Sequence, residues 1–149
     1  MAVEELNPVQ PLSPAGERSA DEILDLLGRR FRPEVVQTRK IGGRQVSYLP
    51  VSVVTERLNK ACNSWNFRIV SRDRELMQLN RWNEATRRSE PREVQVSIVV
   101  GELTIPELGT RQAIGVQALD DGSGEDLIKG AASDSLKKCA SLFGVSVDG

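Results

Sequence analysis

The chain has 149 residues, of which 39% are hydrophobic and 28% charged, and it lacks the run of about 20 apolar residues that a membrane span requires. Its net charge of −1 combines acidic flanks with a basic segment, residues 29–92, in which fifteen basic residues accompany six acidic ones. Histidine is absent, which excludes histidine-based catalytic triads and zinc sites that contain histidine.

The first 18 residues contain three prolines and little periodicity, which predicts a mobile arm. The chain starts with acidic rather than basic residues, unlike a secretory signal peptide, so we expect a cytoplasmic protein. Ser19 and Glu22 have the spacing of a capping box, in which each side chain binds the other residue's backbone amide. A short amphipathic helix is therefore predicted to begin there and to end near Gly28.

Beyond this helix, residues 35–38 are predicted to be extended, and the glycines at 42 and 43 predict a hairpin turn into a strand over residues 45–49. Pro50 is well placed to open a second amphipathic helix. The apolar face of that helix carries four residues, Val54, Leu58, Ala61 and Cys62.

Alternation of apolar and polar residues predicts an antiparallel sheet in the middle of the chain. Residues 65–69 form its first strand and residues 76–82 a less regular second one, whereas residues 83–92 are predicted to form a polar loop or hairpin tip. Two further strands place alternate residues on one face: Val94, Val96, Ile98 and Val100, then Ile114, Val116 and Ala118. Because no helix interrupts these strands, they indicate a meander with one buried face.

A final helix is predicted to begin near Glu125, with an apolar face made of Ile128, Ala132, Leu136, Cys139 and Phe143. The predicted fold class is therefore α+β, a twisted antiparallel β-meander packed against helices. Cys62 and Cys139 are predicted to be buried free thiols in a reducing compartment.

One acidic cluster permits an enzymatic interpretation. Clustered carboxylates can hold magnesium for phosphodiester hydrolysis, and four lie within seven residues: Asp120, Asp121, Glu125 and Asp126. Ordinary turn residues followed by a charged helix start explain the same pattern, so we predict no catalytic residues and no metal. The segment with glycines at 122 and 124 does not end in the lysine and hydroxyl-bearing residue that a phosphate-binding loop requires. We therefore predict no nucleotide and no other cofactor.

Cations beside a flat aromatic ring predict a site for single-stranded DNA, because the cations pair with phosphates while bases stack on the ring. The candidate residues are Arg39, Lys40, Arg44 and Tyr48, together with Lys129, Lys137 and Lys138. Tyr48 is equally consistent with a half-buried strand residue. Lys137 and Lys138 also match the negative end of a helix dipole, which does not account for Lys129.

Several separated motifs resemble the annealing domain of the Rad52 family over roughly residues 20–145. They are PEVVQTR at 33–39, the glycines at 42–43, Tyr48-Leu49, Leu58-Asn59, Trp65, KGAASDSLKK at 129–138 and Phe143-Gly144. The bacterial branch of the family, the DNA damage response A (DdrA) proteins of Deinococcus, is the most similar.

The resemblance implies homo-oligomeric rings in which single-stranded DNA follows an outer basic groove. It assigns DNA contacts to Arg39, Lys137 and Lys138, whereas a further basic residue of the eukaryotic members is replaced here by Ser141. Exposed edge strands and segregated charge also favour contacts between copies.

These observations predict a single-stranded DNA-binding protein of double-strand-break repair, associated with the bacterial nucleoid. It would protect 3′ DNA ends and promote ATP-independent strand annealing. The predicted domains are the arm at 1–18, the DNA-binding domain at 19–145 and a tail at 146–149. The alternatives are a magnesium-dependent nuclease using the acidic cluster, and a ring-forming protein-interaction scaffold that binds no DNA.

Overall fold

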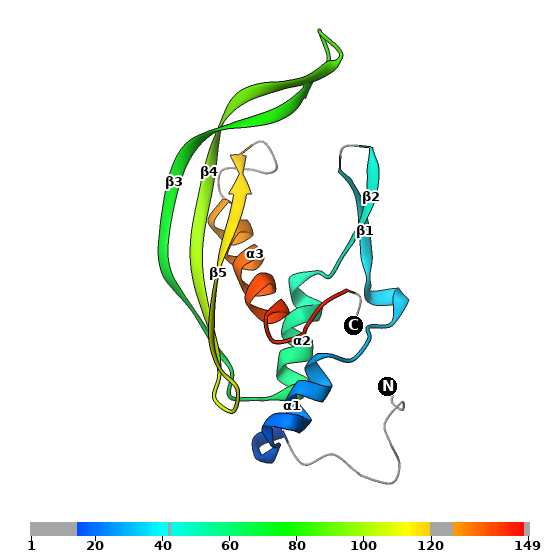
Figure 1. Cartoon of the computed structure of the whole chain (residues 1–149), viewed down its shortest axis with the longest axis vertical. Helices are drawn as coiled ribbons and strands as arrows, with labels where there is room; N and C mark the ends of the chain where they lie inside the picture. The colour runs from blue at the N-terminus through cyan, green and yellow to red at the C-terminus, as the bar shows by residue number, and fades with distance from the viewer. Residues whose placement is uncertain (1–14, 42, 120–126, 148–149) are drawn as a thin grey trace. The chain divides into compact units, whose positions relative to one another are not determined.

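The computed structural model describes residues 15–41, 43–119 and 127–147 and has the predicted mixed α+β composition. The chain forms two compact units (Figure 1). The first comprises Met1–Trp65, Ile105–Gly109 and Phe143–Gly149, and the second comprises Asn66–Thr104 and Thr110–Leu142.

Two helices form the centre of the first unit. The capping box is confirmed at the start of α1 (Ala20–Leu27), where the amide of Glu22 donates to Ser19 Oγ at 3.2 Å and the amide of Ser19 donates to Glu22 Oε1 at 3.0 Å. The apolar face of α1 packs against α2 (Val51–Ala61), which follows Pro50 as predicted. Cys62 is buried, but it caps the C-terminus of α2 instead of lying within the helix.

The predicted hairpin is also present in this unit, as β1 (Gln37–Ile41) and β2 (Arg44–Tyr48). Gly43 has a φ of 80°, a left-handed conformation that glycine adopts without steric cost, whereas Gly42 lies outside the described residues. The predicted extended segment at 35–38 is wrong at its start. Pro33–Val35 is a 3₁₀ turn, because proline fixes φ near −65° and its carbonyl accepts the amide of Val36 at 3.2 Å.

The second unit contains a three-stranded sheet in the order β3-β4-β5, with the bounds β3 (Asn66–Asn83), β4 (Arg88–Ile105) and β5 (Gly109–Ala118) (Figure 1). The prediction of two separate strands before residue 83 is wrong, because β3 is continuous. Its register with β4 shifts between Ile69 and Ser71, and such a bulge interrupts the apolar–polar alternation. The hairpin tip is shorter than predicted, since pairing resumes at Arg88.

Helix α3 (Leu127–Ser141) covers one face of this sheet at very close range. A Cβ atom at Gly115 would lie 2.0 Å from the carbonyl oxygen of Ala131, and one at Gly101 would lie 2.2 Å from Ser135 Oγ. Ser135 Oγ donates to the carbonyl of Ala113 at 2.8 Å, which fixes the helix on β5. In the described part of the chain, no helix has the length and apolar character needed to cross a membrane.

The alternating apolar residues of β4 and β5 lie on the face opposite α3, because Gly101 and Gly115 face the helix and neighbouring strand residues alternate between faces. On that opposite face Val94, Val96 and Ala118 form a small buried cluster. Ile114 and Val116, however, are 57% and 44% exposed. One face of the sheet is covered, as predicted, but the prediction of which residues lie on it is wrong: α3 fits against small residues of β5, and the bulky ones point away from it.

Both cysteines are free and buried, as predicted. In the second unit, Cys139 Sγ lies 3.6 Å from the carbonyl oxygens of Gly101 and Arg111. Burial raises the pKa of the Cys139 thiol, which disfavours the reactive thiolate. Cys139 therefore contributes to packing between α3 and the sheet.

Candidate nucleic-acid interface

The β1–β2 hairpin of the first unit carries four of the predicted DNA-binding residues. Its antiparallel register places Arg39, Arg44 and Tyr48 on one face and Lys40 on the opposite face. The three cations are exposed and Tyr48 is half-buried. The hairpin therefore separates the predicted residues: Arg39, Arg44 and the Tyr48 ring lie on one face, and Lys40 lies on the other.

Arg39 and Tyr48 form a cation–π pair, in which the guanidinium carbon lies 5.2 Å from the ring centroid. At exposed sites this interaction is worth about 0.5–1 kcal/mol. It holds the planar guanidinium over the ring, so Arg39 covers a surface on which a base would stack. The geometry gives Tyr48 the role of orienting Arg39, whose remaining N–H groups can donate to a phosphate.

The three predicted lysines lie on α3 in the second unit. Lys129 and Lys138 are exposed and Lys137 is half-buried. At about 100° per residue, Lys137 lies about 80° around the helix from Lys129, whereas Lys138 lies about 180° from it. The lysines therefore do not form a single row, and only Lys137 and Lys138 are neighbours along the helix.

Lys138 has an intramolecular partner that the sequence interpretation missed. Its Nζ lies 3.0 Å from Asp134 Oδ2, and the same oxygen accepts the amide of Val116 on β5 at 3.0 Å. Asp134 thereby holds Lys138 beside the sheet and competes with any phosphate for its charge. The sequence signal was the i, i+4 spacing of an acid and a base on one helix.

The net charge of +9 over residues 29–92 overstates the cations available to a ligand. Arg29, Arg68 and Arg88 form ion pairs with Asp25, Glu102 and Glu90, at 2.9, 2.8 and 3.4 Å respectively. The hydrogen bond from Gln112, followed by that from Arg68, holds the pKa of the Glu102 carboxyl below its ordinary value. Several cations of the basic segment are therefore already paired with carboxylates within the fold.

Arg57 on α2 is also committed to the fold, in a role that the sequence did not reveal. Its Nη1 donates to the carbonyls of Leu26, Leu27 and Arg29 at 3.1, 3.2 and 2.7 Å, at the C-terminal end of α1. Its guanidinium carbon lies 3.8 Å from the centroid of the Phe31 ring. Burial, reinforced by the charge of Arg29, lowers the pKa of Arg57. No local sequence signal marks a contact between residues so far apart.

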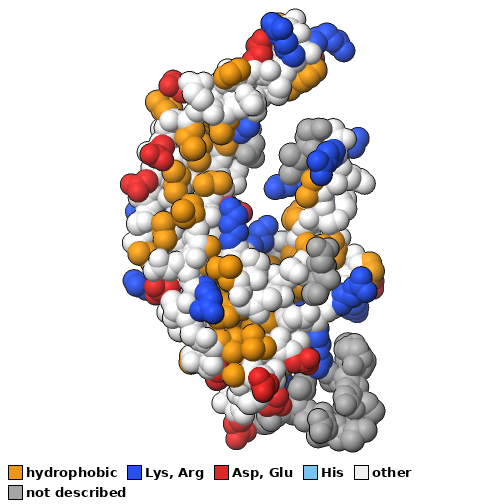
Figure 2. Space-filling view, in the orientation of Figure 1, with side chains coloured by type: hydrophobic (Ala, Val, Ile, Leu, Met, Phe, Trp, Pro, Cys, Tyr) orange, Lys and Arg blue, Asp and Glu red, His pale blue; other side chains and the backbone are white. Residues whose placement is uncertain are grey.

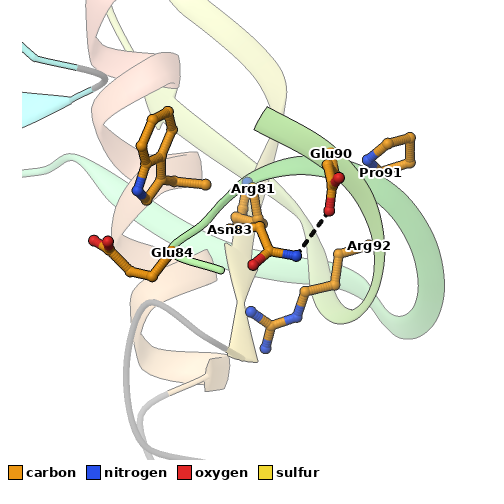
Figure 3. Close-up of a pocket in the computed structure, with 7 residues that line it drawn as sticks. Arg81, Asn83, Glu84, Glu90, Pro91 and Arg92 are labelled. Carbon is orange, nitrogen blue, oxygen red and sulfur yellow. Dashed lines mark hydrogen bonds between the residues drawn. The ribbon is translucent and has the colours of Figure 1, made fainter. Parts of the chain in front are cut away.

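The tip of the β3–β4 hairpin forms a second polar surface (Figure 3). It contains a shallow hollow lined by Arg81, Trp82, Asn83, Glu84, Glu90, Pro91 and Arg92. Asn83 organises the turn, because its Nδ2 donates to Glu90 Oε1 at 2.7 Å and its Oδ1 accepts the amide of Ala85 at 2.9 Å. Glu84 and Glu90 lie among the arginines here, so the tip is less cationic than its arginines suggest.

The acidic cluster of the nuclease alternative, Asp120, Asp121, Glu125 and Asp126, lies outside the described residues. Within the described ranges, no three histidine, cysteine or acidic residues are grouped so that they could hold a metal ion.

Comparison with known proteins supports the nucleic-acid interpretation. The model of the Rad52/22 family of double-strand break repair proteins matches residues 19–147. The matched span includes the β1–β2 hairpin and helix α3, which carry the candidate residues. No curated protein matches the chain.

Proposed function

The chain belongs to the Rad52/22 family of double-strand break repair proteins, and on this premise we propose that it binds single-stranded DNA and anneals complementary strands without ATP. The observation that carries the proposal is the exposed face of the β1–β2 hairpin, where Arg39 is held over Tyr48 beside Arg44. Lys137 and Lys138 on α3 provide further phosphate contacts. Protection of 3′ ends, a closed ring, association with the nucleoid and membership of the DdrA branch are finer parts of the same proposal.

Annealing requires that a strand is held while its base edges remain accessible to a complementary strand. Lysine and arginine side chains meet this requirement, because they bind phosphates and leave the base edges free. The cation–π contact lowers the mobility of Arg39, so less entropy is lost when it binds a phosphate. We therefore expect little sequence preference and strong salt dependence.

Substitution within the hairpin tests which of its faces binds DNA. We expect Arg39→Ala to weaken binding of labelled oligo-dT about tenfold, which corresponds to one charge-assisted hydrogen bond of about 1.4 kcal/mol. Lys40→Ala removes the same charge from the opposite face and should weaken binding only about twofold, through long-range attraction. Fluorescence anisotropy at one salt concentration measures both. Equal losses would contradict the assignment of one face.

The nuclease alternative is tested by a variant that neutralises the acidic cluster, D120N/D121N/E125Q/D126N. We expect the wild type to leave an end-labelled oligonucleotide intact in the presence of magnesium, because the protein binds strands without cleaving them. Denaturing electrophoresis of the labelled strand reports cleavage. Magnesium-dependent cleavage by the wild type that the variant has lost would overturn the proposal in favour of a nuclease.

A further inference from the structure

The carboxylate of Asp134 on α3 binds two groups at once. Its Oδ2 accepts the amide of Val116 on β5 at 3.0 Å and lies 3.0 Å from the ammonium nitrogen of Lys138. Acidic and basic side chains lie close together at several places on the face shown in Figure 2, so an ion pair by itself is an ordinary surface feature. The second bond, to the backbone of a strand, distinguishes Asp134 from an ordinary surface carboxylate.

The bond to Val116 holds the carboxylate in place whether or not Lys138 is beside it. The Lys138 side chain is 52% accessible and that of Asp134 32%, so the lysine has more freedom to turn toward solvent. Turning the carboxylate away from the sheet would break a charge-assisted hydrogen bond to the amide of Val116. A phosphate that binds Lys138 therefore lies close to a carboxylate that stays where it is.

From this arrangement we propose that Asp134 is a positioning residue that promotes release of a bound DNA strand by recapturing Lys138. The inference rests on the proposed function, because it requires that Lys138 binds a phosphate of single-stranded DNA. When the phosphate leaves, the ammonium group of Lys138 returns to a carboxylate that is already in position. Repulsion between the phosphate and the carboxylate also raises the free energy of the bound state.

Strand annealing gives such a residue a use, because the protein must release each duplex before it can bind new strands. Affinity differences among variants of one interface arise mostly in the dissociation rate. We therefore expect the Asp134 charge to speed dissociation, so that its loss gives tighter binding together with slower repeated annealing. A residue that only supported the fold would, when replaced, weaken binding and annealing alike.

Asp134→Asn tests the role of the carboxylate, because asparagine loses the charge and keeps an oxygen that can accept the amide of Val116. Labelled oligo-dT, chased with excess unlabelled oligo-dT in a stopped-flow instrument, should dissociate about three- to fivefold more slowly from the variant than from wild type. Complementary strands that carry a fluorophore and a quencher should anneal more slowly with the variant when protein is limiting. Thermal unfolding followed by circular dichroism confirms that the variant folds.

Two further variants separate an action through Lys138 from a general effect of charge. Asp25→Asn removes the same charge from an i, i+4 ion pair on α1, in which Asp25 Oδ2 and Arg29 Nη2 are 2.9 Å apart, and should leave dissociation unchanged. In a Lys138→Ala background, Asp134→Asn should also leave dissociation unchanged, because there is no ammonium group for the carboxylate to recapture. The four combinations of these two substitutions form a double-mutant cycle.

Slower dissociation from the Asp134→Asn variant only when Lys138 is present would establish the role. Equal slowing with and without Lys138, or equal slowing by Asp25→Asn, would show that charge alone is responsible and would overturn the inference. Unchanged dissociation from the Asp134→Asn variant would overturn it as well, although the proposed DNA binding would stand. A wild type that binds no oligo-dT at low salt would overturn the proposed function itself.

Discussion

Replacing both Lys137 and Lys138 with alanine is expected to weaken binding to a labelled oligo-dT about 100-fold. Each lysine–phosphate hydrogen bond contributes about 1.4 kcal/mol, near the lower limit for charged groups, because the sites are partly exposed and Asp134 competes for Lys138. The two contacts together therefore contribute about 2.8 kcal/mol. Fluorescence anisotropy at about 0.1 M salt measures this loss directly.

Two further variants separate a local contact from a general loss of charge. R30A/R32A removes two exposed cations from elsewhere in the chain, so a non-specific charge effect would appear in it as well. Asp134→Asn removes the competitor of Lys138 while retaining an oxygen that can accept the amide of Val116. We expect it to tighten binding a few-fold. Unchanged binding by the double lysine variant would remove α3 from the interface.

Arg57→Ala is expected to lower the free energy of unfolding by about 3 kcal/mol, which corresponds to a decrease of about 9 °C in the unfolding midpoint. The substitution removes a charged donor from three backbone carbonyls at the C-terminal end of α1 and a cation from the face of Phe31. Differential scanning calorimetry of the variant and the wild type measures the change.

Arg57→Lys is the informative comparison, because lysine keeps the charge but lacks the planar fork of arginine. We expect it to recover less than half of the lost stability. Arg30→Ala serves as the matched control, since Arg30 is exposed and its loss should shift the midpoint by less than about 1 °C. A similar midpoint for Arg57→Ala and wild type would show that the three hydrogen bonds contribute little.

Local signals in the sequence predicted the local elements well. The capping box at Ser19, the glycine turn at Gly43 and the helix after Pro50 depend on residues close together in the chain, and all three are present. The continuity of β3 was missed because a bulge near its start, between Ile69 and Ser71, interrupts the alternation. The sequence also did not reveal which face of the sheet α3 covers. That choice depends on the close approach of α3 to Gly115, which the apolar–polar alternation of β5 does not indicate.

The candidate site was predicted in composition but not in arrangement. The sequence identified Arg39 and Tyr48, which the fold brings together. It did not show that Lys40 lies on the opposite face of the hairpin, which becomes clear only from the register of the two strands. It could not separate Arg57, whose charge is used within the fold, from cations available to a ligand. That distinction depends on contacts between residues about thirty positions apart, which leave no periodic signal.

The most direct test of single-strand binding is a salt titration of the wild-type protein with labelled oligo-dT, followed by fluorescence anisotropy. Binding through phosphates predicts that the logarithm of the association constant falls linearly with the logarithm of the salt concentration, at a slope of about −0.7 for each phosphate contacted. No binding at low salt, or an affinity independent of salt, would contradict the account and leave only an assembling scaffold.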